Sequence, residues 1–175
     1  EQQGQRHQAE RRERDVGIQI HIRQDRCLQV QRPVDQPHRR VVRARIDAAA
    51  KSSKADFVLI EIGGTVGEYE NILFLEAIRM MKSAHPDDVA TVLVSYLPVP
   101  SSIGEMKTKP TQSAVRELNA YGVQPDFIVA RSVGPMDEKR KEKLAIWCNV
   151  RPDHIISAPD VDSIYSVPLN FEKEH

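Results

Sequence analysis

The chain has 175 residues, with 25 Lys and Arg against 25 Asp and Glu, so its formal net charge is zero. A neutral chain has no general electrostatic attraction to nucleic acid or membranes, and this length is typical of one domain with a sizeable core. Two cysteines form neither a metal-ligand spacing nor a disulfide framework, and no apolar run is long enough to cross a bilayer. We therefore expect a soluble cytoplasmic protein that binds neither membranes nor nucleic acid.

The composition changes between Ala50 and Lys51. Residues 1–50 contain 11 Arg and 7 Asp or Glu, but no Lys, Ser, Thr, Asn, Met or aromatic residue. Ile18, Ile20 and Ile22 alternate with polar residues, which is a weak strand signal. A segment this rich in Arg and Gln can bury little, which favours disorder. We therefore divide the chain into residues 1–50, of unusual composition, and residues 51–175, of ordinary globular composition.

From residue 51 onward, short apolar runs alternate with helical patterns. Residues 57–62 form a near-continuous apolar run, as in a strand buried on both faces. A helix is predicted over 70–83, a strand over 90–97, a helix over 110–121, a strand over 126–131, a helix over 137–147 and a brief strand over 155–157. Strands that alternate with helices indicate right-handed crossovers and a parallel sheet. We predict an α/β fold with helices on both faces of that sheet.

The first polar cluster follows the strand over 57–62. Glu61 interrupts the apolar run, and Gly63 and Gly64 allow a tight turn and a close approach to a ligand. A carboxylate at such a turn could hold Mg²⁺, which uses one or two carboxylates together with phosphate oxygens. It could equally be an acid on an edge strand that faces water. Glu68 and Glu70 could complement the dipole of the next helix or accept hydrogen bonds from a ligand.

The second cluster is Lys107-Thr-Lys-Pro-Thr-Gln112, which opens the helix over 110–121. The helix dipole disfavours Lys107 and Lys109 there, so these cations favour an anion site that phosphate would fill, although a solvated basic loop would also explain them. Lys143 lies at the edge of the apolar face of a later helix and could reach a ligand or simply cover apolar surface. Lys139 and Lys141 fit a solvated helix face. We expect Glu61, acting through its magnesium, and Lys107 to converge on one triphosphate.

Four phrases together resemble one known family. They are residues 61–70, residues 94–112, Gln124-Pro-Asp-Phe-Ile-Val-Ala-Arg-Ser132 and Ser157-Ala-Pro-Asp-Val-Asp-Ser-Ile-Tyr165. In this order they resemble the N-terminal synthetase (amidoligase) domain of CTP synthase over about residues 55–174. The resemblance implies a partial P-loop-like domain and a cytoplasmic, homotetrameric ligase of pyrimidine biosynthesis. Such enzymes use ATP to phosphorylate O4 of UTP and replace that group with ammonia, which a glutaminase domain takes from glutamine.

The resemblance also implies roles for individual residues. Glu61 resembles the Mg²⁺ ligand, and Lys143 resembles a contact of the pyrimidine nucleotide. Three further segments have implied roles: Glu68, Tyr69 and Glu70 as contacts of CTP, Lys107, Thr108, Lys109, Pro110, Thr111 and Gln112 as the loop that binds UTP or CTP, and Pro159, Asp160 and Val161 as the segment against the base of ATP. No residue is assigned a catalytic role.

Residues 1–50 depart from the family pattern. They contain neither its Gly-rich phosphate loop nor the Asp that shares the Mg²⁺, which suggests a truncated or frame-shifted start. The glutaminase domain would follow His175. We therefore expect a fragment that retains mainly the UTP- and CTP-binding part and does not catalyse the whole reaction. Two alternatives stay open: another ATP-dependent amidoligase, of the dethiobiotin or cobyrinate synthetase type, and a catalytically inactive remnant.

Overall fold

The computed structural model describes residues 17–23, 37–102 and 104–174. Their strands form one five-stranded sheet in the order β2-β1-β3-β4-β5. The strands are β1 (Gly17–Arg23), β2 (Phe57–Ile62), β3 (Val89–Tyr96), β4 (Phe127–Ser132) and β5 (Ile155–Pro159). The α-helices are α2 (Pro37–Ser53), α3 (Ile72–Ala84), α4 (Lys109–Ala120), α5 (Glu138–Cys148) and α6 (Val167–Lys173), and two short 3₁₀ helices cover Pro152–His154 and Ile164–Ser166.

The parallel sheet that the sequence predicts is present in β3, β4 and β5, which pair in parallel. The prediction did not include β1. This strand lies between β2 and β3 and is antiparallel to both, with Ile20 opposite Ile60 on one side and Thr91 on the other. As a result β2 runs in the same direction as β3 without touching it. The isoleucine alternation at residues 18–22 therefore did indicate a strand, but its position in the sheet depends on pairing with residues far along the chain.

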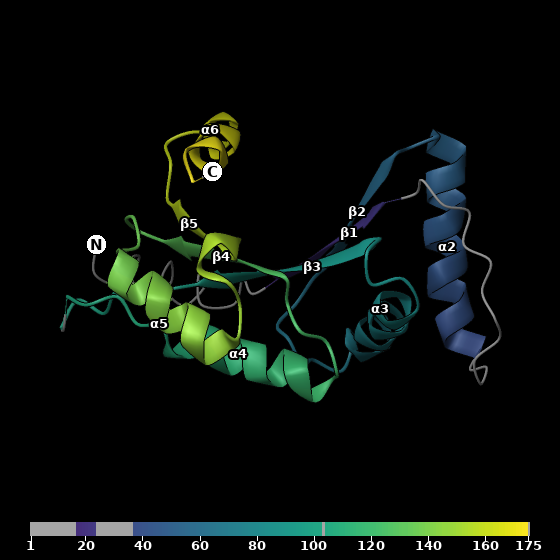
Figure 1. The fold of residues 1–175 in the computed structure, drawn as a ribbon, viewed down its shortest axis with the longest axis horizontal. Helices are drawn as coiled ribbons and strands as arrows, with labels where there is room; N and C mark the ends of the chain where they lie inside the picture. Colours follow the sequence, from purple (N-terminus) through teal and green to yellow (C-terminus); the bar gives the residue numbers. More distant parts are fainter. Residues whose placement is uncertain (1–16, 24–36, 103, 175) are drawn as a thin grey trace.

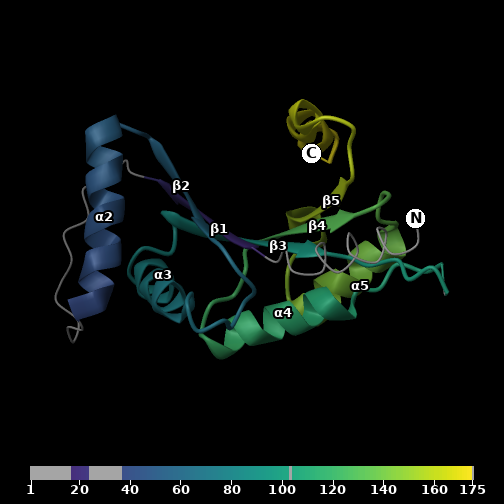
Figure 2. The same cartoon turned by 180° about the vertical axis from the view of Figure 1, so that it is seen from behind.

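Helices lie on both sides of the sheet, as expected. In both views α3, α4 and α5 lie along one face, whereas α6 lies on the other side near β5 (Figures 1 and 2). Helix α2 stands beside α3 at the β2 end of the sheet. Helix α2 places Ile46 and Ala50 in the core. All of β1 and most of α2 lie within residues 1–50, for which we predicted disorder. The remaining core lies between the sheet and α3, α4 and α5, around Leu75, Leu93 and Leu118.

Local sequence signals explain where α4 and α5 begin and where α4 ends. Pro110 lies in the first turn of α4, where its missing N–H costs no hydrogen bond. Gly122 follows the helix with φ +74°, which a residue without Cβ adopts at little cost. Asp137 caps α5 by accepting a hydrogen bond from the Arg140 backbone N–H at 2.8 Å. These signals fix where α4 and α5 start, and both starts border the site described below.

The amino ends of β3 and β4 are joined through Asp126. Its Oδ2 accepts hydrogen bonds from the Thr91 backbone N–H at 2.6 Å, from Thr91 Oγ1 at 2.9 Å and from Lys82 Nζ. The Asp126 N–H donates in return to Thr91 O at 2.8 Å. Because the ladder between β3 and β4 begins at Val92 and Phe127, these bonds extend it by one position. Because Lys82 belongs to α3, its bond to Asp126 also connects that helix to the junction.

Candidate functional site

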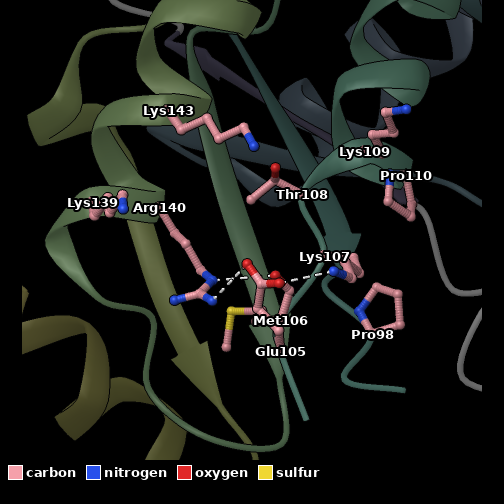
Figure 3. A pocket seen from close by; sticks show the side chains of 10 residues that line it. All are labelled: Pro98, Glu105, Met106, Lys107, Thr108, Lys109, Pro110, Lys139, Arg140 and Lys143. Carbon is pink, nitrogen blue, oxygen red and sulfur yellow. Dashed lines mark hydrogen bonds and ion pairs between the residues drawn. The ribbon is translucent and has the colours of Figure 1, made fainter. Parts of the chain in front are cut away.

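A cavity of about 680 Å³ opens beyond the carboxyl end of β3, between the loop that follows this strand and helix α5. The described residues of its lining include five cationic side chains and one carboxylate, which Figure 3 shows together with the loop and helix that hold them. The lining residues are Pro98, Glu105, Met106, Lys107, Thr108, Lys109, Pro110, Lys139, Arg140 and Lys143. This excess of positive charge suits an anionic ligand, and the volume is in the usual range of ligand pockets.

The structure brings together two segments that are far apart in the sequence. Lys107 and Lys109 come from the start of α4, whereas Lys143 comes from the middle of α5. Four of the six residues predicted for the loop, Lys107 to Pro110, line the cavity. The other two are buried beside it: Thr111 shares a 2.8 Å hydrogen bond with Ser95 Oγ, and Gln112 Nε2 donates to Thr108 Oγ1 at 3.1 Å. Thr111 therefore joins the start of α4 to β3, and Gln112 bonds to the residue that precedes the same helix.

Other predicted residues lie away from this cavity. Glu61 is exposed near the end of β2. Glu68, Tyr69 and Glu70 are exposed in the turn before α3, and the nearby Gly67 lies against Glu117 in the second half of α4. The cavity adjoins the opposite, amino end of that helix. Among the described residues, no group of three or more His, Cys, Asp and Glu could hold a metal ion.

The expected convergence of Glu61 and Lys107 is not found in this cavity, because Glu61 does not line it. Two features of the sheet explain the difference. Strand β1 lies between β2 and β3, which separates these two strands by about 10 Å. Through β1, Glu61 is level with Val92, and β3 continues for four residues beyond that level before the loop begins. The sequence predicted a parallel sheet, but not the antiparallel strand between β2 and β3.

Pro159, Asp160 and Val161 lie in a second cavity, of about 390 Å³, between the sheet and α6. Its lining is mainly apolar and includes Val94, Val129 and Phe171. The backbone N–H of Asp160 donates to Ser132 O at 2.8 Å, which fixes the chain as it leaves β5. These three residues therefore line a different surface from Lys107, toward the opposite side of the sheet from α4 and α5.

Sequence reasoning missed three polar residues of the larger cavity. Glu105 and Arg140 were not singled out, and Lys139 was assigned to a solvated face, although it is both exposed and part of the lining. Lys141 instead pairs with Glu174 of the C-terminal region, with Nζ and Oε2 3.4 Å apart. Spacing could have identified Lys139 and Arg140, because they lie four and three residues before Lys143 and so share its helix face.

Glu105 forms ion pairs inside the cavity. Its Oε2 is 3.0 Å from Lys107 Nζ, and its Oε1 is 3.3 Å from Arg140 Nη2. The hydrogen bond and charge of Lys107, followed by the charges of Arg140 and Lys143, hold the pKa of this carboxyl below its ordinary value. Glu105 is therefore ionised at neutral pH and neutralises part of the positive charge of the lining.

Comparisons with known proteins agree with the resemblance in the sequence. A family model described as CTP synthase N-terminus matches residues 30–175, a range that includes residues 30–50, which we had placed outside the family. The chain is 49% identical over 140 residues to a CTP synthase of Prochlorococcus marinus strain MIT 9312, covering 79% of this chain and 26% of that protein. It is 47% identical over 134 residues to a CTP synthase of Moorella thermoacetica, covering 76% of this chain and 25% of that protein. The chain thus spans about a quarter of the length of these relatives.

Among the described residues, none of the helices has the length and apolar character needed to cross a bilayer.

Proposed function

This chain belongs to the CTP synthase family, and on that basis we propose that its cation-lined cavity binds the triphosphate of UTP or CTP. In the proposed reaction, ATP phosphorylates O4 of UTP and ammonia from glutamine replaces that group. The cavity supplies the part of the site that holds the pyrimidine nucleotide. Family membership favours this substrate over those of the other amidoligases that we considered from the sequence.

One observation carries the proposal. Lys143 of α5 lines the same cavity as Lys107 and Lys109, although nothing in the local sequence joins these residues. Cations gathered from two helices and a loop repel one another, and an anionic ligand would relieve that repulsion. Phosphate groups provide several negative charges at once and can accept hydrogen bonds from several lysines. The start of α4 adds backbone N–H groups that favour an anion at the same place.

The remaining assignments are part of the same proposal. ATP binds with its base against Pro159, Asp160 and Val161, where the apolar second cavity suits a flat aromatic ring. Glu61 would hold Mg²⁺ together with phosphate oxygens, which fits the ligand preference of this ion. Because Glu61 does not line the Lys107 cavity, we assign its magnesium to a separate position from the phosphates held there. The homotetramer and the glutaminase partner also remain proposals.

Titration calorimetry with UTP in magnesium buffer tests the central assignment. Lys107→Ala should weaken UTP binding to the full chain by about tenfold or more, because it removes a charge-assisted hydrogen bond to phosphate. Lys173→Ala is the matched control, since it removes the same charge from an exposed position on α6. A folded chain that does not bind UTP, or equal UTP binding by the two variants, would show that the assignment is wrong.

A further inference from the structure

Glu105 occupies the position in the cavity where an anionic ligand would be expected. Its carboxylate lies between Lys107 and Arg140, and the two ion pairs join it to both sides of the cavity (Figure 3). Among the described residues that line this cavity, it is the only acidic one. A carboxylate that pairs with two cations in this way is negatively charged and accepts hydrogen bonds, as a phosphate group does.

Other bonds hold the Arg140 side chain and the backbone of Lys107 in place. Arg140 Nε donates to Met106 O at 3.2 Å, and its Nη1 pairs with Asp137. The backbone N–H of Lys107 donates to Pro98 O at 2.9 Å, which fixes the loop beside it. If Glu105 moved away, the Arg140 guanidinium would therefore stay at the cavity, and the Lys107 side chain would extend from the same fixed point of the loop. Both groups would then be available to a ligand.

The contacts of Glu105 are weak enough to exchange. Its side chain is 57% exposed, so water screens both of its ion pairs. Within the described part of the chain its carboxylate accepts hydrogen bonds from the side chains of Lys107 and Arg140 only, whereas Asp126 also accepts one from a backbone N–H. An incoming phosphate carries more charge and more acceptor oxygens than one carboxylate. The exchange therefore favours the phosphate at moderate ligand concentrations.

We propose that Glu105 is a built-in competitor for the anion site, and that its carboxylate leaves Lys107 and Arg140 when phosphate groups bind there. The proposal rests on the proposed function of the cavity and adds two roles to it. Glu105 sets how tightly the anion binds, and Arg140 becomes a phosphate contact. While the cavity holds no ligand, Glu105 also limits the repulsion among the cations.

The test compares Glu105→Gln with the wild-type full chain by titration calorimetry at low salt, using two probes. UTP contains the complete proposed ligand, and inorganic tripolyphosphate contains only its charge. Because Gln competes poorly for two cations, Glu105→Gln should bind both probes roughly threefold to tenfold more tightly. Glu142→Gln is the control, because it changes the net charge equally at an exposed position on α5 that does not line the cavity.

The outcomes separate this proposal from the proposed function. Tighter binding of both probes by Glu105→Gln, without a change in Glu142→Gln, supports the competitor role. Unchanged or weaker binding of tripolyphosphate by Glu105→Gln overturns it, even if wild-type UTP binding is strong. If wild type binds tripolyphosphate and UTP equally well, the nucleotide assignment fails, whereas a gain in Glu105→Gln would still support the competitor.

A double variant tests the role of Arg140. In Glu105→Gln combined with Arg140→Met, the gain in tripolyphosphate affinity should fall by at least half, because one of the two released cations is gone. Urea unfolding of the double variant shows whether it remains folded, since Arg140 also holds the Met106 carbonyl. Lys107→Met combined with Glu105→Gln provides a second test that leaves that bond intact. A full gain in both double variants would show that Glu105 does not act through these two cations.

Discussion

Asp126 and Glu105 are both carboxylates that pair with lysine, but they lie at opposite ends of β3 and differ in how they are held. Asp126 Oδ2 accepts hydrogen bonds from a backbone N–H, a hydroxyl and Lys82, and its side chain is 34% exposed. Glu105 has ion pairs with two side chains and is 57% exposed. From this comparison we expect an ion pair to stabilise the fold more when it also satisfies a backbone group, and to exchange more readily for a ligand when it does not.

The largest expected effect is on the Asp126 junction. Asp126→Ala should lower the free energy of unfolding by about 2 kcal/mol, because it leaves the Thr91 N–H without its acceptor and the Lys82 ammonium with only its bond to Val89 O. Urea unfolding followed by circular dichroism measures this change. Asp87→Ala, at an exposed position in the loop after α3, should leave stability nearly unchanged. If the two variants are equally stable, Asp126 is not a structural group.

A smaller effect is expected from the cation of the same junction. Lys82→Met keeps most of the side-chain stem but removes the ammonium, while both bonds from Thr91 to Asp126 remain. We expect a loss of about 1 kcal/mol or less in the same unfolding experiment, since the partly exposed ion pair contributes little by itself. A loss as large as that of Asp126→Ala would mean that the charge pair, and not the backbone bond, stabilises this junction.

The smallest effect is expected at Glu105. Glu105→Gln should change the free energy of unfolding by less than about 0.5 kcal/mol, because its ion pairs are exposed and no backbone group depends on them. Urea unfolding in the absence of ligand provides the measurement, with Glu142→Gln as the reference. A stability loss comparable to that of Asp126→Ala would place Glu105 among the structural groups and remove the contrast between the two carboxylates.

Local sequence patterns predicted most of the elements from residue 51 onward. The apolar run over 57–62 is β2 with the same bounds, and the helix predicted over 110–121 is α4, displaced by one residue. These elements follow from hydrophobic periodicity and from Pro and Gly signals, which act within a few residues. Helix α2 was predicted less well: the composition of residues 1–50 favoured disorder, whereas the helix begins at Pro37. Because this segment is rich in Arg, the apolar helix face that buries Ile46 and Ala50 was not recognised.

The candidate site was predicted only in part. Lys107, Lys109 and Lys143 were expected from charge and helix position, and they line one cavity. Glu105 and Arg140 were missed because their pairing joins a loop to a helix 35 residues away, and no local pattern records it. Glu61, acting through its magnesium, was expected to converge with Lys107 on one triphosphate, but it does not line this cavity. The strand order, with β1 inserted, places it elsewhere.

The sequence by itself determined the family, the order of strands and helices over residues 57–157, and the cationic loop that opens α4, because each depends on patterns of residues that are close together in the chain. Only the tertiary structure decided that β1 separates β2 from β3, that α5 brings Arg140 and Lys143 to that loop, and that Glu105 lies between the cations. The physical reason is that strand pairing and charge pairing are long-range contacts. Their partners are selected when the whole chain packs, and not by the periodicity of any one segment.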